Sequence, residues 1–318
     1  MDKVCYYEYN DKIGITKNNF ENDICLYQKK ECNKRLSEGK HMVQIITDSS
    51  TLMTEAEGKE LGIDVIPLCI NIMDEEYRDL QMDMDSFYAK IAQGGIPRSS
   101  QPPIGEFIEA YKRHQGDKIL NITMADGLSG TYHTACGARE MAENKDDIVV
   151  YNSKTLCGPH RYMVQKARAL AKQGAALEEI VAALDECVQH CESFLIAQDF
   201  DFLRRGGRLT PLAAKFGATL QVKPIMEQTP DGTRLDAYGI SRTIKGAAKK
   251  VMHHLQKKHV GEGYLISIAH ARAAKDALDI AHIMKEAFGK AKVEILDLSP
   301  AFVTQGGPQC IAIQYVKL

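Results

Sequence analysis

Residues Ile119-Leu120-Asn121-Ile122-Thr123 form an apolar run, and Asp126-Gly127-Leu128-Ser129-Gly130-Thr131-Tyr132 follow shortly after it. The run has the composition of a buried strand, and the hydroxyl-rich segment is typical of a helix N-terminus. A strand that leads through a glycine-bracketed loop into a helix favours an anion site, because free backbone N–H groups point outward there. The alternative interpretation is a simple helix cap at Ser129.

A second segment of this kind, Ser99-Ser100-Gln101-Pro102, lies upstream and also precedes a predicted helix. Two such loops in one domain indicate that the chain holds an anionic small molecule, either a phosphate or a carboxylate.

Apolar runs and amphipathic segments alternate along the rest of the chain. We predict strands at about 43–47, 64–70, 117–122, 147–151, 193–198, 219–226, 263–269, 292–297 and 310–316. We predict helices at about 54–61, 84–93, 104–114, 129–143, 158–173, 177–190, 242–258 and 272–288. The alternation predicts an α/β fold: a largely parallel sheet in the N-terminal domain and a smaller α+β domain after it.

The expected division is an N-terminal extension at 1–41, an α/β domain at 42–195 and a C-terminal domain at 196–318. The extension is rich in Asn, Lys, Glu and Tyr, and we expect it to be poorly ordered. One hypothesis is that Met42 is the native start, since a buried strand typical of compact α/β proteins begins there.

Composition narrows the classes of function. The net charge of −2 gives no basic field for nucleic acid or an anionic membrane surface. We find neither a signal peptide nor an apolar run of the roughly 18 residues that a membrane span needs. The nine cysteines are scattered without a C-x-x-C pair, which indicates reduced thiols and a cytoplasmic protein.

The common cofactor motifs are missing from the sequence. It contains no P-loop, no complete dinucleotide fingerprint and no H-E-x-x-H zinc motif, so we expect no cofactor. Cys187, His190 and Cys191 share a predicted helix, but three ligands so close favour helix packing over a metal site.

Two kinds of chemistry remain open from the residues alone. Ser129 could be the nucleophile of a hydrolase, with His270 and Asp297 at the ends of later strands as partners, although the nucleophile-elbow pattern is incomplete. Arg208, in a basic glycine turn, and Arg242 could instead bind a carboxylate or a phosphate, because the planar guanidinium bonds two oxygens at once.

Taken together, seven segments resemble the DegV family of fatty-acid-binding proteins, in the family's order and from Met42 to the C-terminus. They are Ile45-Ile46-Thr47-Asp48-Ser49-Ser50, Val65-Ile66-Pro67-Leu68, Tyr77-Arg78-Asp79, Ser99-Ser100-Gln101-Pro102, Gly127-Leu128-Ser129-Gly130-Thr131-Tyr132, Leu203-Arg204-Arg205-Gly206-Gly207-Arg208 and Lys223-Pro224-Ile225.

The resemblance implies a two-domain protein that holds a long-chain fatty acid between its lobes. It also implies a non-enzymatic role, as the lipid-carrying subunit that presents the carboxylate to a separate ATP-binding kinase subunit for phosphorylation in phospholipid metabolism. The residues that the resemblance assigns to the ligand are Ser100, the loop Ser129, Gly130 and Thr131, the arginines Arg208 and Arg242, and the positions of Cys69 and Gln305.

Two of these positions differ from the family pattern. Cys69 stands where the family has Thr, and a thiol is only a weak donor. Gln305 stands where the family has His, and an amide can donate a hydrogen bond but cannot move a proton. His270 is our candidate to compensate for that loss.

Overall fold

The structure is a computed structural model that describes residues 43–214 and 222–318. The expected N-terminal extension at 1–41 lies outside these residues, and so does the beginning of the strand predicted at 219–226.

A four-stranded, fully parallel sheet forms the first half, in the order β2-β1-β6-β7. Its strands are β1 (Val43–Asp48), β2 (Ile63–Ile66), β6 (Lys118–Thr123) and β7 (Ile148–Asn152). The two central strands are almost wholly buried, as expected of parallel strands that helices cover on both faces. The prediction of a parallel N-terminal sheet is confirmed.

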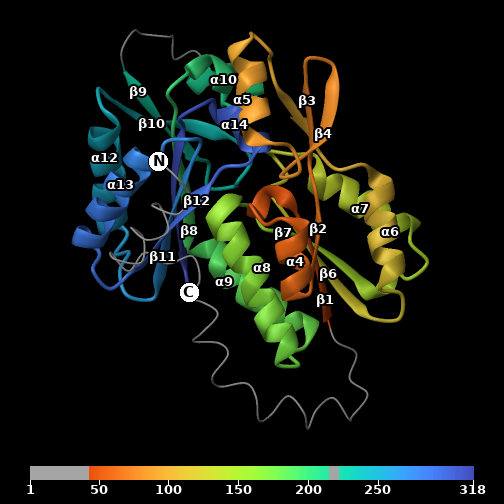
Figure 1. Ribbon diagram of the computed structural model, residues 1–318. Helices are drawn as coiled ribbons and strands as arrows, with labels where there is room; N and C mark the ends of the chain where they lie inside the picture. The colour runs from red at the N-terminus through yellow and green to blue at the C-terminus, as the bar shows by residue number, and fades with distance from the viewer. Residues whose placement is uncertain (1–42, 215–221) are drawn as a thin grey trace.

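Helices cover both faces of this sheet (Figure 1). One face packs against α6 (Ile104–Arg113) and α7 (Thr131–Met141), through the cluster that contains Ile46, Phe107 and Tyr111. The other face packs against α8 (Cys157–Lys172) and α9 (Leu177–Gln189). A shorter helix, α4 (Glu55–Leu61), leads into β2 and ends at Gly62, whose φ of 74° favours glycine.

The second half is built on a mixed six-stranded sheet, in the order β10-β9-β8-β13-β11-β12. Its strands are β8 (Cys191–Ile196), β9 (Lys223–Gln228), β10 (Leu235–Ser241), β11 (Tyr264–His270), β12 (Lys292–Asp297) and β13 (Ile311–Lys317). Only β11 and β12 pair in parallel. The boundary expected at 195/196 lies within β8.

Helix α8 lies between the two sheets. It contacts β1 on one side and β11 and β13 on the other, whereas α12 (Ile244–Lys257) and α13 (Ala274–Ala287) cover the far face of the mixed sheet (Figure 1). The molecule is therefore layered as helix, sheet, helix, sheet, helix, and α8 joins the two halves.

The strand predicted at 64–70 is wrong as a single element. Pro67 lacks an N–H for a sheet ladder, and the chain leaves the parallel sheet there. It then enters a separate antiparallel sheet of β4 (Glu75–Arg78), β3 (Cys69–Ile72) and β5 (Arg98–Ser100).

Short elements complete the described chain. They are η1 (Ser49–Thr51), α5 (Met84–Ala92), η2 (Lys145–Asp147), α10 (Phe200–Gly206), α11 (Pro211–Ala214) and α14 (Pro300–Gly306). Of the helices, α10, α11 and α14 were not predicted, because one or two helical turns leave little periodic pattern to detect. Within 43–214 and 222–318, every helix is too short or too polar to cross a membrane.

Candidate functional site

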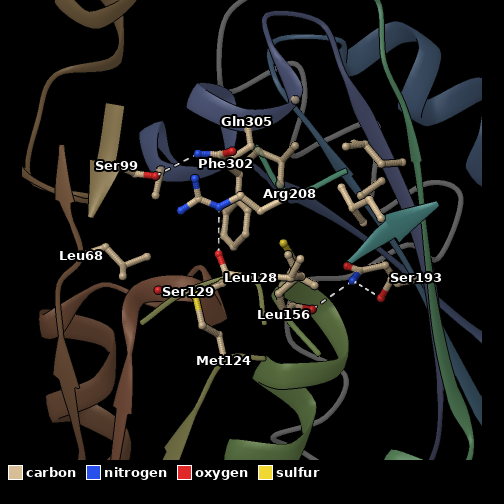
Figure 2. Close-up of a pocket in the computed structure, with 18 of the residues that line it drawn as sticks. Leu68, Ser99, Met124, Leu128, Ser129, Leu156, Ser193, Arg208, Phe302 and Gln305 are labelled. Atoms are coloured by element: carbon tan, nitrogen blue, oxygen red, sulfur yellow. Dashed lines mark hydrogen bonds between the residues drawn. The ribbon is translucent and has the colours of Figure 1, made fainter. Parts of the chain in front are cut away.

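A cavity lies where α14 and β5 approach the loop before α7 and the inner face of the mixed sheet (Figure 2). Its empty volume is about 890 Å³ with the open mouth included. Most of its wall is apolar, and polar groups gather in two places. The side chains of the wall are mainly Leu68, Met124, Leu128, Leu156, Leu195, Leu235, Leu298 and Phe302.

Arg208 is the one charged residue among the described residues that line the cavity. Its Nε donates to the carbonyl oxygen of Leu128 at 3.1 Å and its Nη1 donates to the carbonyl oxygen of Gly206. No ion pair with a carboxylate holds it within the described chain. Burial, and then the charge of Arg234, lower the pKa of the Arg208 guanidinium. A partly buried cation without a counter-ion favours an anionic ligand.

The side chain of Gln305 lies next to Arg208 in Figure 2. Its Nε2 donates to Ser99 Oγ at 3.2 Å and to Thr304 Oγ1 at 3.1 Å, which ties α14 to β5. Ser99 was not singled out in the sequence, where Ser100 was preferred, yet both serines line the cavity. The two serines are neighbours on a short edge strand, so the local sequence does not say which of them turns inward.

Cys69 is buried directly beside Ser100, its partner in the β3–β5 register. It does not line the cavity, and its Sγ accepts a hydrogen bond from Arg78 Nη1 at 2.6 Å. Burial raises the pKa of the Cys69 thiol, and Arg78 partly opposes that rise. Cys69 therefore bonds Arg78 outside the cavity wall, beside Ser100 in the sheet.

The loop before α7 contributes one of its three predicted residues to the cavity wall. Ser129 lines the cavity, and its Oγ lies 2.8 Å from Thr131 Oγ1. Thr131 is fully buried, and Gly130 is the N-cap of α7, where a Cβ would meet the side chain of Gln101. These two residues shape the loop.

His270 and Arg242 are not brought to the cavity. His270 is buried at the end of β11, 3.6 Å from Asp297 at the end of β12, and neither residue lines the cavity. Arg242 is exposed just before α12. Since no histidine bonds Ser129 within the described residues, the hydrolase arrangement is not formed.

The far end of the cavity is also polar, which the sequence reasoning missed. Ser193 on β8 and Gln314 on β13 face each other in the sheet register and line the cavity. Gln314 lies between apolar residues in β13, and a polar residue at a buried strand position was the signal in the sequence that could have indicated this polar end.

A buried carboxylate holds α14 in place from outside the cavity. Asp79 accepts hydrogen bonds from Ser49 Oγ at 2.8 Å, Ser299 Oγ at 2.9 Å and the N–H of Ala301 at 3.0 Å. The desolvation from complete burial outweighs these bonds and raises the pKa of Asp79 to about 6. Gln305 and Phe302 thus depend for their position on a residue at the end of β4.

No cluster of three His, Cys, Asp or Glu side chains suited to a metal ion occurs within the part of the chain that the structure describes.

Solved structures with this fold come from several bacteria. A DegV protein of Bacillus subtilis, described as a fatty acid binding protein, is 26% identical, with a TM-score of 0.77 over 87% of this chain and 100% of that chain. A DegV family protein of Thermus thermophilus, described by its fatty acid binding, has a TM-score of 0.79 at 21% identity, over 87% of this chain and 100% of that chain. The predicted α/β fold, with a parallel sheet in its first half, is therefore confirmed.

Sequence relatives agree with the fold. A DegV domain-containing protein of Listeria monocytogenes is 32% identical over 220 residues, which are 68% of this chain and 77% of the relative. The protein DegV of Bacillus subtilis is 29% identical over 245 residues, 75% of this chain and 86% of the relative. The model of the family described as "Uncharacterised protein, DegV family" matches residues 42–318. The chain belongs to the DegV family.

Proposed function

We propose that this chain binds a long-chain fatty acid in the cavity and presents its carboxylate to a separate ATP-dependent kinase subunit. The carboxylate lies against Arg208, Ser100, Ser129 and Gln305, and the acyl chain follows the apolar wall between the halves 42–195 and 196–318. In this proposal the protein is a carrier, and the partner supplies the chemistry.

The observation that carries the proposal is the cation at one end of an apolar cavity. Arg208 has no carboxylate partner among the described residues, and the hydroxyls of Ser100 and Ser129 in the same cavity provide further donors. A carboxylate taken out of water needs such donors, since an unpaired buried charge is costly. A fatty acid matches both parts of the cavity, one charged head and one long apolar tail.

The energetics allow such binding. About 14 buried methylenes gain roughly 11 kcal/mol gross, at about 0.8 kcal/mol each. Immobilising the ligand and ordering the side chains subtract much of that gain. The carboxylate contacts therefore set the orientation of the ligand, and the tail supplies most of the affinity.

Relatives support the ligand class. A DegV family structure from Ruminococcus gnavus, 25% identical with a TM-score of 0.76 over 86% of this chain and 99% of that chain, is described with vaccenic acid. The Bacillus subtilis DegV is described as a fatty acid binding protein. The family resemblance, together with the missing nucleotide motifs, supports a partner that supplies ATP.

Two features bear on the kinase step. Ser100 is exposed while it lines the cavity, so the head end opens to the outside, where a partner can reach it. Gln305, in place of a histidine, cannot take up a proton, and its amide already donates both hydrogens to Ser99 and Thr304. The partner must then provide any proton transfer that phosphorylation needs.

Mass spectrometry of organic extracts from the natively folded protein tests the ligand. A stoichiometric long-chain fatty acid is the expected result. Retention of inorganic phosphate or a phosphorylated metabolite, without lipid, would contradict the proposal and support a different anion at Arg208.

The partner needs its own experiment. The loaded protein is mixed with the fatty acid kinase ATP-binding subunit from the same cell and with ATP, and acyl phosphate is trapped with hydroxylamine. Acyl hydroxamate that forms only when both proteins are present is expected. Binding of fatty acid without product would limit the protein to a carrier that does not serve this kinase.

A further inference from the structure

The inner face of the mixed sheet carries a row of polar side chains that crosses four strands. Ser193, Gln314, Ser267 and Glu294 occupy matching register positions on β8, β13, β11 and β12. Ser267 Oγ donates to Glu294 Oε1 at 2.6 Å. The row ends in the cavity, which Ser193 and Gln314 line, and Figure 2 shows Ser193 on the side opposite Arg208.

The Gln314 amide has a fixed orientation. Its Nε2 donates to the carbonyl oxygen of Leu156 at 3.0 Å, and its Oε1 accepts from the N–H of Gly158 at 3.3 Å. If the amide were turned over, its oxygen would face the carbonyl oxygen of Leu156 and its NH₂ group would face the N–H of Gly158, and neither pair can form a hydrogen bond. The start of α8 therefore determines which atom of Gln314 faces Ser193.

The atom that faces Ser193 is a donor. Gln314 Nε2 donates to Ser193 Oγ at 2.8 Å (Figure 2). The serine hydroxyl must act as the acceptor in this contact, so its own hydrogen is directed elsewhere. Within the described chain no acceptor for that hydrogen is found, although Ser193 is 93% buried, with 7% of its surface exposed.

We propose that this far end binds an oxygen atom on the acyl tail, so that the cavity prefers a hydroxy or keto fatty acid to the unsubstituted chain. The inference rests on the proposed function. A tail oxygen accepts the free hydrogen of Ser193, whereas a methylene pressed against it leaves a buried donor unsatisfied. The far end of the cavity therefore discriminates between substituted and unsubstituted tails, and Arg208 binds the carboxylate of both.

The test compares ligands with the purified, delipidated full chain. Hexadecanoic and octadecanoic acids, unsubstituted and with one hydroxyl moved stepwise along the chain, compete with a fluorescent fatty acid. We expect one isomer to bind about 3-fold to 10-fold more tightly than its parent acid, as one net hydrogen bond allows. If every hydroxylated isomer binds no better than its parent acid, the inference is wrong while the proposed function stands.

Two variants identify the group responsible. In Ser193→Cys, the sulfur still accepts from Gln314 Nε2, but the thiol is only a weak donor, so the affinity ratio between the best isomer and its parent acid should fall towards one. In Arg208→Met, both affinities should weaken and the ratio should persist. A ratio unchanged by Ser193→Cys would overturn the assignment. If no fatty acid in the panel binds the parent protein, the proposed function itself fails.

Discussion

The carboxylate of Asp79 accepts a hydrogen bond from the hydroxyl of Ser299 at 2.9 Å, which joins the end of β4 to the start of α14. Because α14 carries Gln305 and Phe302 into the cavity, this buried contact couples the small antiparallel sheet to the cavity wall. The raised pKa of Asp79 gives the contact a dependence on pH.

Asp79→Asn should remove a pH dependence of stability. Burial raises the pKa of Asp79 from 3.8 to about 6, so the folded chain keeps this proton to a higher pH than the unfolded chain does. The contribution of Asp79 to the free energy of unfolding therefore falls as the pH rises from about 4 to about 6. The free energy of unfolding of the variant minus that of the parent, measured with urea, should therefore increase as the pH rises through that range.

Groups that titrate equally in the parent and in Asp79→Asn cancel when the free energies of unfolding of the two proteins are subtracted. Burial lowers the pKa of His160, so protonation of this residue destabilises the fold as the pH falls, in the parent and in the variant alike. A difference between parent and variant that does not change with pH would contradict the prediction.

Arg208→Met should weaken fatty acid binding about 10-fold to 100-fold, because a charge-assisted hydrogen bond to the carboxylate is lost. Titration of a fluorescent fatty acid measures the loss. Arg242→Met is the matched control, since Arg242 is exposed and lies outside the cavity. Equal losses in the two variants would place the head group elsewhere.

Ser100→Ala should weaken binding by about 1–3 kcal/mol, since a buried carboxylate loses a donor. The exposed Ser86 on α5, replaced by Ala, provides a control outside the cavity. If Ser100→Ala does not change the affinity for fatty acid, Ser100 does not bind the carboxylate, and Ser99 becomes the candidate donor.

Ser129→Ala should weaken lipid retention only by the loss of one donor to the carboxylate, and it should leave ester hydrolysis unchanged. Its hydroxyl bonds Thr131 at the start of α7, without a histidine to activate it. Hydrolysis of a long-chain nitrophenyl ester, measured on both proteins, should be equally slow. Ester hydrolysis by the parent that disappears in the variant would restore the hydrolase hypothesis.

Gly158→Ala should destabilise the fold by about 1–3 kcal/mol, because overpacking forces the surrounding backbone to shift. A Cβ at this position would lie 2.2 Å from the Cβ of Ser267, where α8 meets the mixed sheet. Gly105→Ala in α6 meets no heavy atom within 4 Å and should stabilise the helix by about 0.5–1 kcal/mol. Urea unfolding of both variants checks the contrast.

Local patterning accounts for the long elements. The buried run at β6 and the amphipathic spacing of Phe107, Ala110 and Tyr111 in α6 depend on residues close together in the chain, so their prediction succeeded. The three-stranded sheet escaped prediction because β4 and β5 are short and largely polar, and pairing with β3 is what holds them extended.

By itself, the sequence determined the alternation of strands and helices, the parallel first sheet and a basic group at Arg208, since periodicity and residue chemistry are local properties. Only the tertiary structure decided that Arg208 and Gln305 line one cavity with Ser99 and Ser100, that His270 lies outside it, and that Ser193 faces Gln314. These relationships join residues far apart in the chain, and they arise from the packing of α8 between the two main sheets and of α14 against β3 and β5.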